Sequence, residues 1–205
     1  MIDDFNGGDD TVVSGFFPGP SNTAYAGAIG GSRTLEATSG AAGATLLSVA
    51  AGILIHGQGP VGGGTSLVVW DAAGAGLGGI DLTDGGSDDG LSIDILGIDS
   101  GLVNLEFTIT DTSAMSSSLL LIGLGVGTQG FLFTDFVGTA DFTDADYISL
   151  EITALAGSDL TLDFVETAPV SVALVPEPAT LSLLGLGVFA LCRRRSRPGR
   201  SLQPP

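Results

Sequence analysis

Residues Leu102–Thr110 read LVNLEFTIT, and the alternation in this stretch decides the fold class. Every second residue from Val103 to Ile109 is apolar, and the residues between them are Asn, Glu and Thr. Successive side chains of a β-strand point to opposite faces of the sheet, whereas a helix repeats its apolar residues every three or four positions. The stretch therefore predicts a strand with one buried and one hydrated face, as in antiparallel sheets.

The same period of two recurs through residues 1–168. In LTLDFVE, residues 160–166, the alternation predicts that Phe164 points to the core and Val165 to solvent. Further candidate strands are Arg33–Thr38, Ala44–Ala50, Gly52–His56, Ser66–Asp71, Leu91–Leu96, Ser117–Leu124 and Tyr147–Ala154.

Turn-forming stretches such as GQGPVGGG, AAGAGLGG and DGGSDDG separate these candidates. Glycine and aspartate favour such turns, because glycine tolerates positive φ and aspartate bonds its own backbone. About ten strands at this spacing predict an all-β fold, an antiparallel β-sandwich of the jelly-roll type. We expect this domain to cover residues 1–168.

The charge of the chain is strongly lopsided. It has 23 acidic residues, six arginines and no lysine, which gives a formal net charge of −17. Arg33 is the only arginine before residue 193. Nucleic-acid binding needs a basic surface to neutralise phosphates, so nucleic acid is excluded as a partner of the body. The missing lysine also excludes Schiff-base chemistry.

The chain changes character after Thr167. Residues 169–178 hold three prolines, which block helix and ladder formation, and so predict a linker. Residues 179–192 are almost wholly apolar; a helix of that length spans about 21 Å, against about 30 Å of hydrocarbon core. Residues 193–205 form a basic, disordered tail, whose cluster is Arg193, Arg194, Arg195 and Arg197. Snorkelling arginines offset the missing length, so we predict a short transmembrane helix with the acidic body outside.

Pro176, Glu177 and Pro178, the apolar run and the arginine cluster follow one another at the end of the chain. Together, over about residues 175–197, they resemble the PEP-CTERM sorting signal of bacteria. The resemblance implies export in a Gram-negative bacterium that produces exopolysaccharide, and processing by an exosortase, a transpeptidase-like membrane enzyme. The PEP tripeptide would be the recognition element. MIDDFNGGDD has neither a basic start nor an apolar stretch, so we expect an export leader upstream of it.

The body carries a second, less specific resemblance. IDDFNGGDDTVVSG, GGIDLTDGGSDDGLSIDI and LEITALAGSDLTLDFVET are similar to jelly-roll ectodomains found upstream of PEP-CTERM tails. The fold of those ectodomains is similar to galactose-binding-like and carbohydrate-binding modules. This resemblance implies a sandwich and supplies no ligand.

Catalytic signals are weak. His56 is the only histidine, no G-x-S-x-G elbow surrounds a serine, and sequence spacing cannot select a carboxylate pair from 23 acidic residues. We therefore predict no catalytic residue and interpret His56 as a turn or edge histidine. Trp70 is expected in the core rather than on the surface as a sugar-stacking platform.

The stretch DLTDGGSDDG is the most specific candidate metal site, with Asp81, Asp84, Asp88 and Asp89. Calcium prefers several oxygen ligands on a flexible loop, although the spacing is not that of an EF-hand. A second acidic stretch is DFTDADY, residues 141–147. Two interpretations stay open for both loops, namely solvated turn aspartates and a structural calcium site; no other cofactor is predicted.

Three functions are compatible with these observations. The leading hypothesis is a non-enzymatic, exported protein of the cell surface or extracellular matrix, associated with exopolysaccharide and biofilm. The first alternative is a calcium-dependent carbohydrate-binding module, which an exposed Trp or Tyr on a concave face would favour. The second is a polysaccharide hydrolase or lyase, which two facing carboxylates about 5–9 Å apart would favour.

Overall fold

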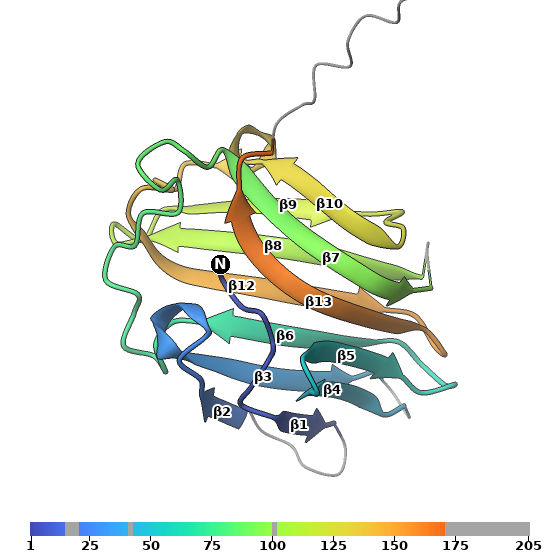
Figure 1. Cartoon of the computed structure of the whole chain (residues 1–205). Helices are drawn as coiled ribbons and strands as arrows, with labels where there is room; N and C mark the ends of the chain where they lie inside the picture. Colours follow the sequence, from blue (N-terminus) through green and yellow to red (C-terminus); the bar gives the residue numbers. More distant parts are fainter. Residues whose placement is uncertain (15–20, 41–42, 100–101, 171–205) are drawn as a thin grey trace, which may run out of the picture. The chain divides into compact units, whose positions relative to one another are not determined.

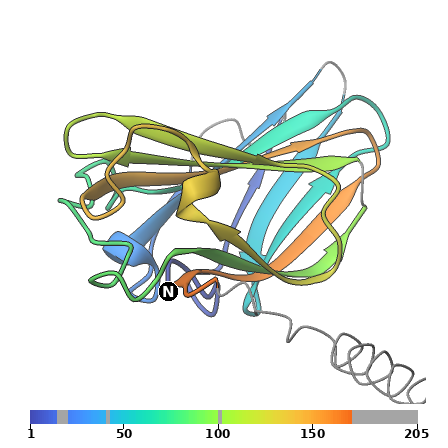
Figure 2. The same cartoon turned by 90° about the horizontal axis from the view of Figure 1, so that it is seen from above.

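The computed structural model describes residues 1–14, 21–40, 43–99 and 102–170. In this part of the chain, strands form two antiparallel sheets that face each other (Figures 1 and 2). The first sheet has, in spatial order, β1 Asp10–Val13, β4 Thr45–Ala50, β5 Ile53–Gln58, β13 Asp159–Ala168, β7 Gly90–Ile98 and β10 Gly127–Leu132. The second has β11 Val137–Gly138, β9 Ser116–Leu121, β8 Val103–Asp111, β12 Ala145–Ala154, β6 Gly64–Trp70, β3 Ser32–Ser39 and β2 Ser21–Ala24.

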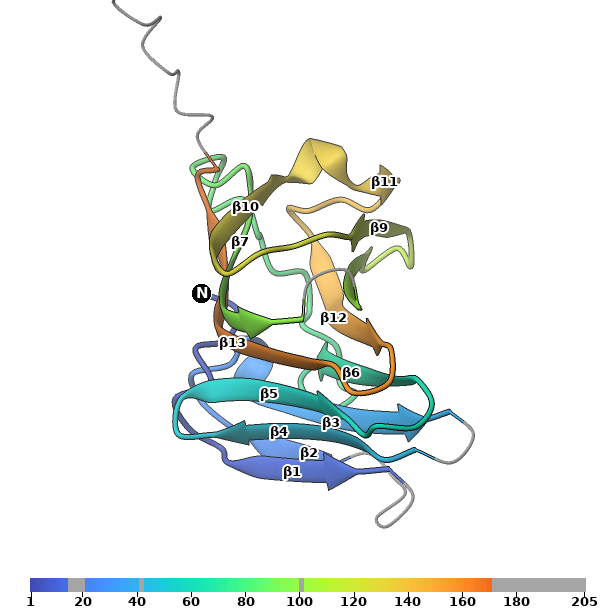
Figure 3. The same cartoon turned by 90° about the vertical axis from the view of Figure 1, so that its right-hand side faces the viewer.

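The chain passes repeatedly from one sheet to the other, as Figure 3 shows for β5 and β6 and for β12 and β13. Two short 3-10 helices, η1 Ile29–Gly31 and η2 Phe133–Asp135, lie in the connections. This architecture confirms the predicted antiparallel β-sandwich. The expected strands are all present, and the quoted stretch forms β8 with its apolar residues buried at every second position.

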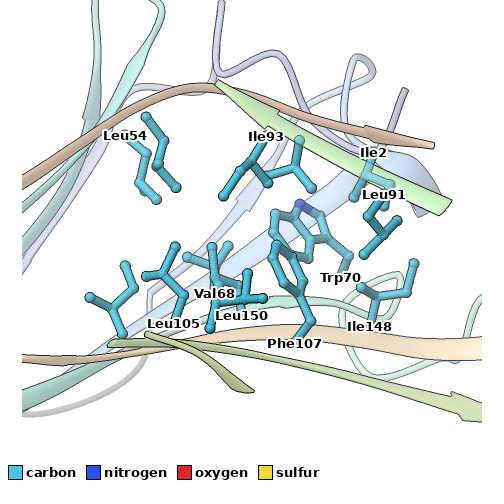
Figure 4. Packing of buried hydrophobic residues seen from close by; sticks show 14 of the residues in the cluster. Ile2, Leu54, Val68, Trp70, Leu91, Ile93, Leu105, Phe107, Ile148 and Leu150 are labelled. Atoms are coloured by element: carbon cyan, nitrogen blue, oxygen red, sulfur yellow. The ribbon is translucent and has the colours of Figure 1, made fainter. Parts of the chain in front are cut away.

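The core lies between the sheets, and Trp70 is the largest side chain that it buries (Figure 4). Val68, Phe107 and Leu150 approach from the second sheet, and Leu91 and Ile93 from the first. Full burial of each such side chain contributes about 1.5–3 kcal/mol of transfer free energy. The prediction of Trp70 as a core residue is therefore confirmed.

One predicted alternation is wrong. Val165 is fully buried, whereas Phe164 is partly exposed. The pairing of β13 with β7 shifts register between Leu162 and Val165, so the extra residue moves the later side chains to the other face. At this bulge the N-terminal segment pairs with β13: the Ile2 amide donates to the Val165 carbonyl (2.9 Å), and the Val165 amide to the Asp3 carbonyl (2.9 Å).

Asp3 and Arg33 form a buried ion pair, which we call the clasp together with Trp70. Arg33 Nη1 lies 2.9 Å and 3.0 Å from the two carboxylate oxygens of Asp3, and Trp70 Nε1 donates to Oδ2 at 2.9 Å. Arg33 Nη2 donates to the carbonyl oxygens of Gly7 and Gly8. These bonds compensate for much of the cost of removing both charges from water.

In the part of the chain that is described, no helix has the length and apolar character needed to cross a bilayer. The predicted transmembrane helix at residues 179–192 and the basic tail at 193–205 lie outside the described residues, as does the linker beyond Val170.

Candidate functional site

His56 lies in the core and not at a turn or sheet edge, because β5 is flanked by β4 and β13. Its Nδ1 is 2.8 Å from the Ser66 hydroxyl of the opposite sheet, and its Nε2 has no partner among the described residues. Burial lowers the pKa of His56 to about 4. The expectation of a turn or edge histidine is therefore wrong: this imidazole is sealed, neutral and out of reach of substrate.

The loop between β6 and β7 carries the four aspartates of the calcium hypothesis. Asp81 Oδ1 accepts bonds from the Thr83 amide (2.8 Å) and hydroxyl (2.6 Å), and Oδ2 accepts one from the Gly85 amide (3.0 Å). The Thr83 hydroxyl and these amides hold the pKa of Asp81 below its usual range. Asp89 Oδ1 accepts from the Val170 amide.

The second acidic stretch is also engaged with its own loops. Asp141 Oδ1 accepts from Thr143, and Asp111 Oδ2 accepts from the Asp141 amide at 2.9 Å. Asp144 accepts from the Thr112 hydroxyl. Within the described ranges no group of three or more His, Cys, Asp or Glu side chains is gathered as metal ligands would be. Calcium binding stays a prediction that only titration can decide.

A groove of about 390 Å³ opens where β3, β6 and β12 meet their neighbouring turns. Hydroxyl-bearing residues and glycines make up most of its lining, which consists of Thr38, Ser39, Gly40, Gly63, Gly64, Thr65, Thr153, Ala154 and Leu155. Neither an aromatic ring nor a carboxylate is among these lining residues. The groove thus lacks both features that were expected to mark an aromatic sugar platform or a pair of catalytic carboxylates.

The glycines that line the groove have little room for a side chain. A Cβ on Gly64 would collide with the Thr45 hydroxyl and the Gln58 amide oxygen beneath it, and one on Gly63 would lie 2.8 Å from the Ala154 carbonyl oxygen. Thr45 donates to Gln58 Oε1 at 2.7 Å, and both are buried. The floor of the groove therefore rests on a hydrogen-bonded polar pair.

The outward face of the second sheet supplies the surroundings of the groove. Cross-strand pairing aligns Thr38 with Thr65, Thr65 with Thr153, and Thr153 with Asn104 on β8. The next outward row, about 7 Å along the strands, aligns Glu36, Leu67, Glu151 and Glu106. A row of hydroxyls thus borders a row that carries negative charge.

A family model matches the C-terminal region of the chain. The model of the PEP-CTERM protein-sorting motif matches residues 174–196. The chain carries a PEP-CTERM sorting motif. The motif implies export to the cell envelope of a Gram-negative bacterium and processing by an exosortase. Pro176, Glu177, Pro178 and the arginines from Arg193 to Arg195 fall inside the match, which lies outside the described residues.

Known sequences and solved structures give little information beyond the motif match. No curated protein matches the chain in sequence. Among solved structures, PfGH50B is similar at a TM-score of 0.43 and 9% identity, over 67% of this chain and 22% of that chain. The agarase AgWH50C is similar at a TM-score of 0.37 and 13% identity, over 66% and 22%. TmCBM61 in complex with β-1,4-galactotriose is similar at a TM-score of 0.34 and 7% identity, over 77% and 86%.

The chain spans about a fifth of the length of PfGH50B and AgWH50C. At these TM-scores the likeness carries no inference about function.

Sequence reasoning missed the groove altogether. Gly63 and Gly64 belong to GQGPVGGG, which was interpreted only as a separator between strands. A signal was present, because a run of glycines that enters a strand often marks a close approach of backbones. Nothing in the sequence, however, places Thr38, Thr65 and Thr153 side by side, since their neighbourhood depends on strand order.

Proposed function

We propose that this protein is a non-catalytic ectodomain that the PEP-CTERM motif delivers to the cell surface, where it becomes part of the extracellular polysaccharide matrix. The observation that carries the proposal is the motif at residues 174–196, which follows the β-sandwich of residues 1–170 in the sequence. The most specific residues of the chain therefore belong to a sorting motif and not to a catalytic site.

Two features of the sandwich support a non-catalytic role. His56, the only histidine, is fully buried, and its pKa of about 4 keeps it neutral at ordinary pH. The residues that line the groove include no carboxylate to act as acid or nucleophile. An acidic exterior also favours a well-hydrated protein that does not adhere to its own copies.

Surface delivery is testable in a Gram-negative host that contains an exosortase. The chain is expressed behind an export leader, and its exposure is measured by protease treatment of intact cells. We expect surface exposure and a shortened C-terminus for the parent chain, and loss of both for the triple substitution Pro176→Ala, Glu177→Ala, Pro178→Ala. Thr108→Val, on the outer face of the sandwich, is the matched control. Equal exposure and processing of parent and triple variant would contradict the proposal.

A further inference from the structure

We propose that the groove between the ends of β3, β6 and β12 is a binding site for a neutral glycan chain. The inference deepens the matrix function proposed above and rests on it for the class of ligand. Its basis is the combination of a hydroxyl row, an apolar edge and a fixed backbone floor in one groove.

Most of the accessible surface that lines the groove is apolar, and the threonine row supplies its few polar contacts. A hydroxyl group both donates and accepts a hydrogen bond, as sugar hydroxyls do, so it can pair with either role of a sugar group. Thr38 and Thr153 are exposed, and Thr65 lies between them in the cross-strand register. Neighbouring strands are about 4.8 Å apart, so the three residues present a regular row to a ligand that lies across the strands.

The apolar edge supplies contacts for the C–H face of a sugar ring. Leu155 lines the groove with 56% of its surface exposed, and its amide is bonded to the Leu102 carbonyl at 2.9 Å. Leu102 is itself 42% exposed. A site that combines apolar surface with a few placed polar groups is the usual composition of a small-ligand site.

The floor is held in place before any ligand arrives. Gln58 Nε2 donates to the Gly62 carbonyl at 3.2 Å, and the Gly40 amide donates to the Gly63 carbonyl at 2.7 Å. Thr45 supports Gly64 from below. A rigid floor lowers the ordering cost of binding, which matters where no aromatic ring lines the groove and affinity is expected to be weak.

The distribution of charge around the groove favours a neutral ligand. No residue that lines the groove is charged, and Glu36, Glu151 and Glu106 stand in the adjoining row of the same face. Arg33, the only arginine or lysine in residues 1–170, is buried in the clasp. An acidic polysaccharide would therefore meet like charge without compensation.

The test is affinity electrophoresis of the full chain in native gels that contain dextran, galactan or xyloglucan as neutral polysaccharides, or alginate as an acidic one. We expect retardation by at least one neutral polysaccharide and none by alginate. The double variant Thr65→Val, Thr153→Val should bind about tenfold more weakly, because two hydrogen-bonding hydroxyls are lost. Thr108→Val, on the same face but outside the groove, should stay within about twofold of the parent.

Thermal unfolding of each variant accompanies the binding assay, and Thr38→Val provides a second, exposed position should the double variant be unstable. No retardation by any of the three neutral polysaccharides, retardation by alginate, or full binding by both groove variants would overturn the site. Surface delivery, measured as above, is independent of the groove. A failure here leaves delivery intact, and a failure of delivery leaves the binding assay unaffected.

Discussion

Strand β6 connects two buried polar centres, one that carries charge and one that is neutral. At its Trp70 end the clasp buries a full ion pair, in which Asp3 meets two Arg33 contacts and an indole N–H. Near its Gly64 end, Ser66 meets His56, which has one partner and stays uncharged because burial lowers its pKa. The ion pair thus stays charged at the clasp, where its partners neutralise it. His56 stays neutral, because it has too few partners to offset the cost of burying a charge.

The difference separates a structural end from an end available for function. The clasp ties the N-terminal segment to both sheets and leaves no opening around Asp3, which is fully buried. The other end carries the groove, above a polar pair that is neutral throughout. Substitutions at the two ends should therefore differ in the size and in the pH dependence of their effects.

The largest effect is expected at the clasp. Asp3→Asn leaves the buried Arg33 guanidinium without its counter-charge, which should lower the free energy of unfolding by about 3–5 kcal/mol. Asp4→Asn is the control, because Asp4 is partly exposed and accepts from the Tyr25 hydroxyl at the surface; it should cost less than about 1 kcal/mol. Denaturant unfolding measures both, and equal losses would contradict the role given to the clasp.

The His56 end should respond to acid. The pKa of His56 is about 4 in the folded protein, against 6.5 for an ordinary histidine. Between these values the unfolded chain binds the proton and the folded chain does not. Proton uptake by His56 therefore costs nothing above pH 6.5 and lowers the free energy of unfolding as the pH falls toward 4, by about 3 kcal/mol in total.

The measurement is the free energy of unfolding against pH for the parent and for the double variant His56→Leu, Ser66→Ala. The double variant removes the imidazole and its partner together, while the carboxylates titrate as before. We expect the difference between the two curves to change across this window. Parallel curves would show that His56 does not titrate as a buried group.

A smaller effect is expected at the groove floor. Gly64→Ala introduces a Cβ that collides with Thr45 and Gln58, and should destabilise the fold by about 1–3 kcal/mol. Gly97→Ala in β7 is the matched control, because the nearest atom to its new Cβ is the Thr161 hydroxyl at 3.9 Å. That change should be neutral or stabilise slightly, since glycine weakens a strand. Equal thermal midpoints for the two variants would contradict the close packing of the floor.

The smallest effect is expected from calcium. Asp81 already accepts bonds from Thr83 and Gly85, so the turn is formed by the chain itself. We expect the same thermal midpoint in calcium chloride and in chelator. A midpoint that rises with calcium in the parent chain, but not in Asp84→Asn, would establish the calcium interpretation of this loop instead.

The two regions also show what the sequence can and cannot reveal. Period-two alternation identified the long strands such as β8, because a strand with one buried face has an apolar residue at every second position. It missed β2, with the sequence SNTA, and β10, with GTQGFL, because neither alternates. It also misplaced Phe164, since a bulge changes the phase without changing the composition.

The two polar centres could not be predicted from the sequence, for a different reason. The pairing of Asp3 with Arg33 and of His56 with Ser66 depends on which strands face each other across the core. Strand order in a sandwich is set by non-local packing, which leaves no local pattern. The sorting motif, in contrast, is a contiguous signal, and it was recognisable from Pro176 to Arg195 without any fold.

Mass spectrometry of the protein released from the cell surface tests the central claim most directly. An exported, processed ectodomain predicts peptides from the sandwich, up to about β13, in the extracellular fraction, and none that contain Arg193–Arg200. Recovery of the intact chain, arginines included, from the cytoplasm alone would contradict delivery by the PEP-CTERM motif.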